Sequence, residues 1–337
     1  MKVIDLNLRE RGYKIYVERG AIGKAAELFK LNRKVMIITD DGVPCDYAEK
    51  VKSQCKDATV FTVPTGEESK SLGMVERICR AMLELEMTRS DCVVAVGGGV
   101  VGDLAGFVAS TYMRGVDFYN IPTTLLAQVD SSIGGKTAVN LGGVKNIVGA
   151  FYQPGGVIID PDLLSTLPER QIKNGLAEAI KMSLTSDKEL FELIESGNVT
   201  DNIEEIIYRS LLIKRAVVEA DEREGGVRKI LNLGHTLGHA IEAAEELGGL
   251  YHGECVAIGM TVVCAPDVKG RLITLLKRVG LPYGYSRVEE AIGYLGSDKK
   301  RSGDAIDVVY VDEVGSYRIE KTAIDSFGEI IRKEILR

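Results

Sequence analysis

The sequence has few histidines, no closely paired cysteines, no long apolar runs and no excess of positive charge. Its 337 residues contain 42 Lys and Arg against 49 Asp and Glu, a net charge of −7. Nucleic-acid binding favours a positively charged protein, so we do not expect nucleic acid as a partner. No stretch approaches the roughly 20 apolar residues of a membrane span, and the N-terminal segment lacks the apolar core of a signal peptide. These absences predict a globular protein without a membrane partner.

The six cysteines are widely spaced and never form a CxxC pair. Neither a disulfide framework nor a cysteine zinc site is indicated, and we expect a reduced, cytoplasmic protein. A chain of 337 residues exceeds what one hydrophobic core usually supports, which predicts two domains.

The first half of the chain alternates β-branched runs with amphipathic stretches, which predicts an α/β domain with a parallel sheet. Strands are expected in "KVMIITDDG", "ATVFTVPTGE" and "DCVVAVGGG". From about Pro161, apolar residues recur at three- and four-residue spacing, typical of a mainly α-helical domain. A small β-hairpin is expected to turn at Glu313 to Ser316. We therefore expect a Rossmann-like domain over residues 1–160 and a helical domain over residues 161–337, with a cleft between them.

Three glycines, Gly97 to Gly99, follow the third strand and precede a helix expected to begin near Val100. Glycine lets the backbone approach a ligand, and the N–H groups of a helix N-terminus bind phosphate. The pattern is not GxGxxG, so a tight turn without a ligand is the alternative. Polar side chains at the strand ends favour a dinucleotide, with Asp40 and Glu67 toward ribose and Lys70 toward phosphate. Thr123 and Thr124 follow a further apolar strand.

Lysines among glycines predict an anion-binding region in this acidic protein. Lys136 and Lys145 lie in a segment with five glycines, next to Asn140 and Asn146 and downstream of Arg114. Such lysines suit close recognition of an anion, although solvated surface lysines are the alternative. In the second half, Glu178 and Lys181 share a helical face, and Lys214 and Arg228 flank an acidic segment. A substrate with both a phosphate and a carboxylate would account for this much positive charge.

All three histidines, His235, His239 and His252, fall within eighteen residues. His235 and His239 are four apart on a predicted helix, a spacing by which two imidazoles can bind one metal ion. The glutamate of HExxH is absent, which argues against metalloprotease chemistry. A helix with surface histidines is the alternative, but the third histidine, in "YHGE", favours a metal site.

Five motifs occur in order: "GGGVVGD", "SSIGGKTAVN", "GLAEAIK", "NLGHTLGHAIE" and "HGECVAIGM". Through them the chain resembles the 3-dehydroquinate synthase branch of the sugar-phosphate cyclases, over nearly its whole length. The resemblance implies a lyase of the shikimate pathway to chorismate and the aromatic amino acids. Its reaction turns 3-deoxy-D-arabino-heptulosonate 7-phosphate into 3-dehydroquinate and phosphate. The implied steps are transient oxidation by NAD, phosphate elimination, reduction and intramolecular aldol closure, with zinc or cobalt as the metal and a homodimer as the assembly.

The resemblance also implies a site. Glu178, His235 and His252 would bind the metal. His239 would then contact the substrate or relay a proton, and would not bind the metal together with His235. The implied substrate residues are Arg114, Lys136, Lys145, Asn146, Lys181, Lys214, Arg228, Asn232 and His239, with Lys299 or Lys300 closing the pocket. The implied NAD residues are Asp40, Glu67, Lys70, Gly98, Gly99, Val100, Val101, Gly102, Asp103, Thr123, Thr124, Asp130, Lys136, Lys145, Leu163, Leu164, Ser165 and Thr166.

Two features depart from the resemblance. Gln171 follows Arg170 where a glutamate is common in the loop before Glu178, and we expect it to weaken one polar contact on the nicotinamide side. The segment after "HGECVAIGM" is shorter than usual, and Pro266 should break the helix there. Three other readings stay open: a sibling cyclase forming 2-deoxy-scyllo-inosose or epi-valiolone, a glycerol-1-phosphate-type dehydrogenase, and a nucleotide-binding regulator without catalysis.

Overall fold

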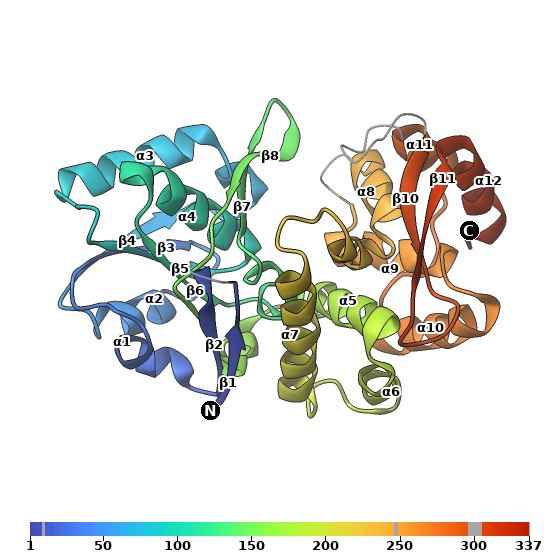
Figure 1. Cartoon of the computed structure of the whole chain (residues 1–337), viewed down its shortest axis with the longest axis horizontal. Coiled ribbons are helices and arrows are strands. Elements are labelled where there is room, and N and C mark those ends of the chain that lie inside the picture. Colours follow the sequence, from blue (N-terminus) through green and yellow to red (C-terminus); the bar gives the residue numbers. More distant parts are fainter. Residues whose placement is uncertain (9–10, 246–248, 296–304, 337) are drawn as a thin grey trace. The chain divides into compact units, whose positions relative to one another are not determined.

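The computed structural model of the chain divides into two compact units, Met1–Pro168 and Glu169–Arg337 (Figure 1). It describes residues 1–8, 11–245, 249–295 and 305–336. Lys299 and Lys300, which were expected to close a substrate pocket, lie outside the described residues.

A seven-stranded sheet with the order β1-β2-β9-β6-β5-β3-β4 forms the centre of the N-terminal unit. The strands are β1 (Lys2–Leu6), β2 (Tyr13–Val17), β3 (Lys34–Asp40), β4 (Asp57–Val63), β5 (Cys92–Gly97), β6 (Asp117–Pro122) and β9 (Gly156–Ile159). Every neighbouring pair is parallel except β1 with β2. The predicted α/β fold with a parallel sheet is confirmed, and the sheet has in addition an antiparallel edge strand, β1, that was not predicted.

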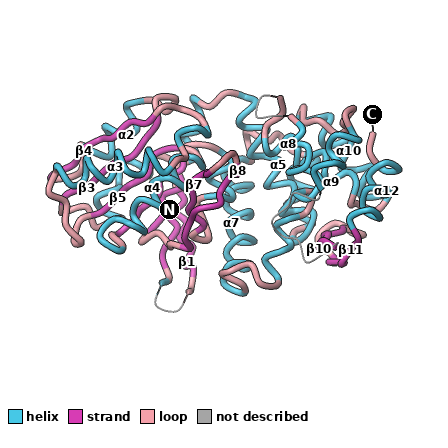
Figure 2. Tube along the Cα trace, turned by 90° about the horizontal axis from the view of Figure 1, so that it is seen from above, coloured by secondary structure: helices cyan, strands magenta, loops and turns pink. Residues whose placement is uncertain are grey.

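Helices cover both faces of this sheet (Figures 1 and 2). One face packs against α3 (Leu72–Glu84) and α4 (Gly99–Thr111), and the other against η2 (Ala21–Lys24), α1 (Ala25–Leu28) and α2 (Cys45–Lys52). Alternate residues of β3 divide between them, because successive side chains of a strand point to opposite faces. Met36 faces α3 and α4, whereas Ile37 faces the other layer. Burial on both faces explains why these strands read as continuous apolar runs.

A separate antiparallel hairpin, β7 (Lys136–Leu141) and β8 (Val144–Phe151), packs on α4. Gly142 and Gly143 form its turn at φ values of +60° and +78°, a conformation that side chains disfavour. These glycines, expected beside an anion-binding site, turn the chain between the two strands. Short helical turns complete the unit: η3 (Glu67–Ser69), η4 (Tyr112–Arg114), η5 (Ala127–Ser131) and η6 (Pro161–Thr166).

The C-terminal unit is mainly helical and carries one β-hairpin, as predicted. Its elements are α5 (Glu169–Ser186), α6 (Lys188–Ser196), α7 (Ile203–Ala220), η7 (Val227–Asn232), α8 (His235–Ala244), α9 (His252–Val262), α10 (Pro266–Val279), α11 (Val288–Tyr294), β10 (Ala305–Tyr310), β11 (Arg318–Ala323) and α12 (Ile324–Glu334). Every residue of α9 after His252 is buried, so α9 is the central helix of this unit. Pro266 begins α10 after α9 has ended, which confirms the predicted break. Among the described residues, no helix combines the length and the apolar character needed to cross a membrane.

Candidate functional site

Close glycine contacts set the position of α9 in the C-terminal unit. A methyl group on Gly253 would lie 2.0 Å from the Asn174 carbonyl oxygen of α5. The Gly253 N–H instead donates a hydrogen bond to Asn174 Oδ1 at 2.6 Å. A methyl group on Gly259 would lie 2.0 Å from the carbonyl oxygen of Gly234, the residue before α8. Gly253 and Gly259 of the "HGECVAIGM" motif therefore have a packing role, since larger residues would push apart the helices that carry the histidines.

An ion pair fixes the first turn of α9. Arg170 donates from Nε to Glu254 Oε1 at 2.8 Å and from Nη2 to Glu254 Oε2 at 2.7 Å. Glu254 Oε2 also accepts the Tyr251 N–H at 2.8 Å. Two parallel bonds of this kind hold both distance and orientation. Arg170 and Gln171 were expected in a loop, but both lie in the first turn of α5, where Arg170 anchors the helix that begins with His252.

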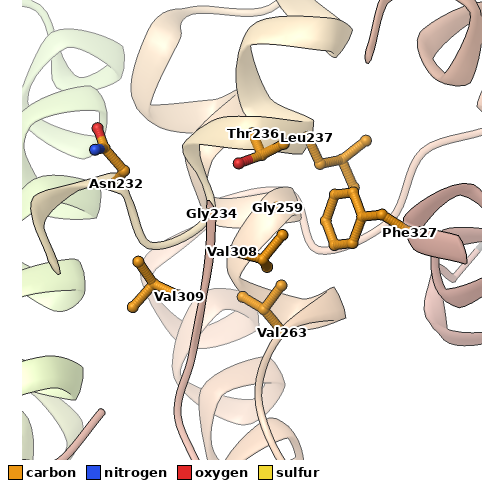
Figure 3. A pocket seen from close by; sticks show the side chains of 9 residues that line it. All are labelled: Asn232, Gly234, Thr236, Leu237, Gly259, Val263, Val308, Val309 and Phe327. Atoms are coloured by element: carbon orange, nitrogen blue, oxygen red, sulfur yellow. The ribbon is translucent and has the colours of Figure 1, made fainter. Parts of the chain in front are cut away.

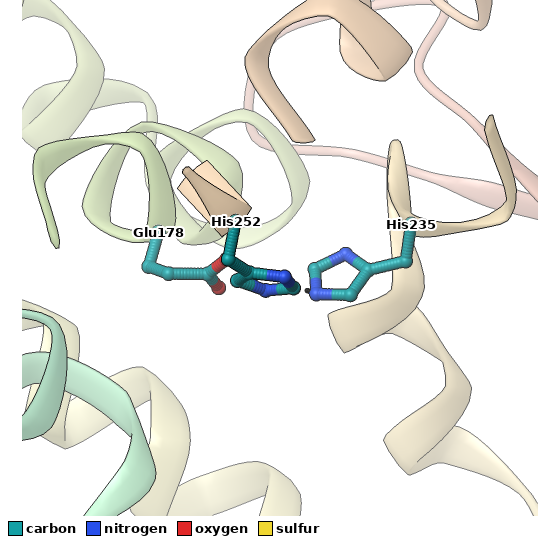
Figure 4. A group of neighbouring side chains, drawn as sticks. All are labelled: Glu178, His235 and His252. Atoms are coloured by element: carbon teal, nitrogen blue, oxygen red, sulfur yellow. Dashed lines mark ion pairs between the residues drawn. The ribbon is translucent and has the colours of Figure 1, made fainter. Parts of the chain in front are cut away.

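Glu178 of α5, His235 of α8 and His252 of α9 point toward one another (Figure 4). Glu178 Oε1 lies 3.5 Å from His252 Nε2 and 3.7 Å from His235 Nε2. Glu178 is fully buried, and its Oε1 has no hydrogen-bond partner in the part of the chain that the structure describes. A buried carboxylate oxygen without a hydrogen bond is costly, so this arrangement calls for a further partner.

The three side chains fit a divalent metal ion. Zinc bonds to imidazole nitrogen and carboxylate oxygen at about 2.0–2.2 Å, so neighbouring donors of a tetrahedral site lie about 3.4 Å apart. The two Glu178–histidine distances of 3.5 and 3.7 Å approach that separation. One donor atom from each of the three residues lies within 4.8 Å of the others. One carboxylate and two imidazoles also leave room for a further ligand, as catalytic zinc sites do.

The electrostatics of the cluster give its members different protonation states. Burial raises the pKa of Glu178, but the Lys181 ammonium and the His252 imidazole together lower it to about 2. Burial lowers the pKa of His235 well below 6.5, and the charge of Lys181 adds to the effect. Burial also lowers the pKa of His252, yet the facing carboxylates of Glu178 and Glu242 raise it to about 10. At neutral pH the cluster therefore holds a carboxylate, a neutral imidazole and an imidazolium.

Buried cations stand on the elements around this cluster. Lys181 of α5, Lys214 of α7 and Arg228 of η7 are 1%, 6% and 1% exposed. A small core of Met182, Val217, Ile230 and Leu231 packs α5, α7 and η7 together, which brings the three cations into one region. Lys181 pairs with Glu178 Oε2, and Arg228 donates to the Glu222 carbonyl. Lysine and arginine side chains gathered in this way create a positive potential, so the region suits an anionic ligand.

Asn232 and His239 complete the predicted substrate group. Asn232 donates from Nδ2 to Glu224 Oε1 at 3.1 Å. Its backbone borders a small hollow lined by Asn232, Gly234, Thr236, Leu237, Gly259, Val263, Val308, Val309 and Phe327 (Figure 3). The Asn232 side chain points away from the apolar side chains of that hollow, which therefore suits packing and not an anion. The His239 ring lies 5.3 Å from that of His235 and 5.9 Å from that of His252, so it borders the cluster.

In the N-terminal unit, predicted cofactor residues gather at the carboxyl edge of the parallel sheet, where α/β folds bind ligands. The Thr123 N–H donates to the Gly97 carbonyl at 2.9 Å. A methyl group on Gly98 would lie 3.0 Å from the Thr124 side chain, and one on Gly99 would lie 3.1 Å from Ser131 Oγ. The glycine turn and the two threonines are thus neighbours, and α4 begins at Gly99 with its N–H groups at the same edge.

A hydrogen-bonded network links several of the predicted residues. The buried Lys70 ammonium lies 2.7 Å from Asp103 Oδ2 and donates to Asn146 Oδ1. Asn140 donates to Glu67 Oε1 at 2.9 Å and accepts the Asn146 N–H at 2.8 Å. Burial raises the pKa of Asp103, and the Lys70 charge only partly opposes it. The network joins three predicted NAD residues to Asn146, a predicted substrate residue.

The other predicted residues of this unit are less closely grouped. Asp40 Oδ1 accepts hydrogen bonds from the Gly42 and Val43 N–H groups at 2.9 and 3.1 Å, so its carboxylate closes the turn after β3. Lys136 begins β7, whereas Lys145 lies near the start of β8, so the hairpin separates them along its length. Arg114 is exposed in η4, and Asp130 lies in η5.

Two predicted stretches mix buried and accessible side chains. Val101 and Gly102 lie in the first turns of α4, with Val101 in the core and Val100 half-buried. Leu163 and Leu164 are buried in η6, whereas Ser165 and Thr166 are exposed. Thr166 Oγ1 lies 3.1 Å from the Tyr47 hydroxyl.

Two contacts of the site were not predicted: that of Glu242 with His252, and that of Arg170 with Glu254. Glu242 follows His235 by seven residues, a spacing that returns to the same helical face and could have indicated its direction. Arg170 and Glu254 are 84 residues apart, and no local pattern connects them.

The chain matches the sequence models described as 3-dehydroquinate synthase N-terminal, over residues 60–174, and 3-dehydroquinate synthase C-terminal, over residues 175–301. It is 44% identical over 353 residues to the 3-dehydroquinate synthase of Streptococcus mutans serotype c, covering 98% of this chain and 99% of that one. It is 43% identical to the enzyme of that name from Streptococcus thermophilus, with the same coverage. Its fold matches a crystal structure of 2-deoxy-scyllo-inosose synthase complexed with carbaglucose-6-phosphate, NAD⁺ and Co²⁺. That match has a TM-score of 0.90 and 27% identity over 99% of this chain and 100% of the other.

The fold is therefore that of the sugar-phosphate cyclases, as the predicted resemblance implied. Within this class, the chain belongs to the 3-dehydroquinate synthase family.

Proposed function

We propose that this protein converts 3-deoxy-D-arabino-heptulosonate 7-phosphate to 3-dehydroquinate and inorganic phosphate, as a carbon–oxygen lyase of the shikimate pathway. The observation that carries the proposal is the buried group of Glu178, His235 and His252 beside buried cations, in a chain 44% identical to a 3-dehydroquinate synthase. A substrate with one phosphate and one carboxylate matches the charge of that region.

We assign NAD to the N-terminal unit and a divalent metal, zinc or cobalt, to the C-terminal unit. The support for NAD is the glycine turn at the N-terminus of α4 and the polar residues beside it, which include Thr123, Thr124 and Asp103. The support for the metal is the orphaned Glu178 Oε1 between two imidazole nitrogens. When bound, NAD accepts and returns a hydride, and the metal lowers the pKa of an alcohol and polarises a carbonyl.

The side chains of the protein contribute charge and position. Lys181, Lys214 and Arg228 are held by packing and hydrogen bonds before any substrate arrives, so they stabilise negative charge without reorganising. We assign Lys214, Arg228 and Asn232 to the carboxylate side of the substrate, and Arg114 to its phosphate. Lys136, Lys145 and Asn146 complete the substrate contacts, and His239 holds or moves a proton beside the metal cluster.

Two rival activities differ from this one in measurable ways. The 44% identity to a 3-dehydroquinate synthase exceeds the 27% identity to the inosose synthase, which favours a carboxylate-bearing substrate. A glycerol-1-phosphate-type dehydrogenase would release NADH, whereas the proposed reaction regenerates NAD in each turnover.

Substrate discrimination tests the proposal. Phosphate release is measured from the heptulosonate phosphate and from glucose 6-phosphate, which lacks a carboxylate. We expect release from the first and not from the second, and we expect Arg228→Met to raise KM for the first because it removes a buried cation. Release from glucose 6-phosphate alone would transfer the assignment to the inosose synthase branch.

We further propose that the protein is a homodimer in the cytoplasm. All six cysteines are free thiols, which supports a reducing compartment. Leu141, Val144, Ile147 and Phe151 are exposed apolar side chains on the β7–β8 hairpin, and their grouping supports contact with a second copy. Size-exclusion chromatography with light scattering should give twice the chain mass of 36.6 kDa, and a single-chain mass would contradict the dimer.

A further inference from the structure

The two nitrogens of His252 have different partners. Nε2 faces Glu178 Oε1 at 3.5 Å, within the candidate metal cluster. Nδ1 lies 3.1 Å from Glu242 Oε2, on the opposite side of the ring. A carboxylate at neutral pH only accepts hydrogen bonds, so the proton of this contact sits on Nδ1. Once its own proton has left, Nε2 is then the nitrogen that can offer a lone pair to a metal.

His235 is arranged in the same way with a weaker partner. Its Nδ1 lies 3.1 Å from the backbone carbonyl of Leu233, and its Nε2 faces Glu178 Oε1. Both imidazoles therefore present Nε2 to the cluster, but one is held by a neutral carbonyl and the other by a charged carboxylate. The carboxylate makes its imidazole the more basic ligand.

Helix α8 supplies both a candidate ligand and the partner of another ligand. Glu242 follows His235 by seven residues, close to two turns of helix, so the two share the face turned toward the start of α9. The Glu242 side chain is 20% exposed and that of His252 is 28% exposed, so solvent screens their contact only in part. The interaction thus links α8 to α9 on the side of His252 that faces away from Glu178.

We infer that Glu242 is a positioning residue for the metal, acting through His252 Nδ1. It fixes the tautomer and the ring orientation of His252 and increases the basicity of Nε2. The inference rests on the proposed metal site of Glu178, His235 and His252, and it adds a residue that neither the sequence analysis nor the family resemblance assigned. Loss of such a partner typically lowers metal affinity about 10- to 100-fold.

Glu242 also belongs to a second group, with His239 and His252, in which one donor atom from each residue lies within 4.8 Å of the others. That group shares His252 with the first one, so it offers a different role for Glu242, as a direct metal ligand. If Glu242 is a positioning residue, its replacement leaves every metal ligand in place. If Glu242 is a direct ligand, its replacement removes one ligand from the metal.

The test is a Co²⁺ titration of the full-length protein after chelation, with a competing chromophoric chelator and the visible absorption of the bound ion as readouts. Glu242→Gln keeps an amide oxygen that can accept from Nδ1 but removes the charge, whereas Glu242→Ala removes the acceptor. We expect affinity to fall about 10-fold in the first and toward 100-fold in the second. One Co²⁺ should still bind, with the absorption band of the wild-type protein.

Glu245→Gln is the matched control, because Glu245 lies at the end of the same helix but pairs with Tyr285 and Arg287. It should leave Co²⁺ affinity unchanged. Unaltered affinity in both Glu242 variants would overturn the inference, and so would a changed cobalt spectrum in Glu242→Gln, since that would make Glu242 a direct ligand. His252→Ala separates this result from the larger proposal: if it binds Co²⁺ as tightly as the wild type, the metal site itself is wrong.

Discussion

Replacing Glu178 by glutamine tests the buried charge at the centre of the C-terminal unit. Lys181 and Glu178 are 1% and 0% exposed and form an ion pair on α5. Removing one partner of a buried pair leaves an uncompensated charge, which typically costs about 3–5 kcal/mol. Burial raises the pKa of Glu178, but the Lys181 ammonium and the His252 imidazole lower it overall, which agrees in direction with a stabilising pair.

The assay is urea unfolding followed by far-ultraviolet circular dichroism, at pH 7 with a chelator present. Glu76→Gln is the control, because it breaks the 2.6 Å pair between Glu76 and Arg80 on α3, whose side chains are 63% and 71% exposed. Exposed pairs of this kind contribute about 0–1 kcal/mol. If Glu178→Gln costs no more than Glu76→Gln, the argument from the buried pair is wrong.

The effect of Glu178→Gln on the free energy of unfolding should also depend on pH, in a direction that the pKa of Glu178 sets. The folded pKa of Glu178 lies below its ordinary value, so the carboxylate stabilises the fold above pH 4.5. That contribution is lost as the pH falls through about 2. The difference in stability between the wild type and Glu178→Gln should therefore shrink steadily below pH 4.5, and a constant difference would contradict the assigned pKa.

Three further predictions follow from the same geometry. Metal binding to the chelated protein at pH 6.5 should release about one proton, because His252 has a pKa of about 10 while His235 is already neutral and Glu178 ionised. Calorimetry in buffers of different ionisation enthalpy measures this number, and zero or two protons would refute the assignment. Gly253→Ala should weaken metal binding and destabilise the fold by about 1–3 kcal/mol, since its methyl group would lie 2.0 Å from the Asn174 carbonyl. Gly270→Ala in α10, which meets open space, should not destabilise it, and equal effects of the two substitutions would contradict the packing argument. Burial raises the pKa of Cys92 and Cys264 to about 12, so iodoacetamide at pH 8 should label the exposed Cys45 and leave these two unlabelled. Mass spectrometry of the peptides measures the labelling. Rapid labelling of Cys264 would show that it is not buried.

Local patterns predicted much of this molecule because they depend on short stretches of chain. The buried strands read as apolar runs, the helices showed their apolar spacing, and Pro266 marked the break between α9 and α10. The β7–β8 hairpin was missed because its glycines also suit an anion site, and sequence alone does not separate turn geometry from ligand geometry.

The composition of the cluster depends on long-range packing. Spacing alone paired His235 with His239, and only the family resemblance proposed His252 and Glu178 instead. In the structure, Gly253 and Gly259 let α9 approach α5 and the start of α8, which brings Glu178, His235 and His252 together. The clash that an added methyl group would cause at these glycines becomes visible only when the neighbouring helix is in place.

The central claim is that the protein eliminates phosphate while it uses NAD as a catalyst. The most direct measurement incubates the purified protein with NAD, zinc or cobalt and 3-deoxy-D-arabino-heptulosonate 7-phosphate, and follows inorganic phosphate together with absorbance at the reduced-nicotinamide band. We expect many turnovers of phosphate release without a lasting rise in that absorbance, and we expect His252→Ala to abolish the release. A lasting rise in NADH in proportion to the substrate consumed would contradict the claim and indicate a dehydrogenase.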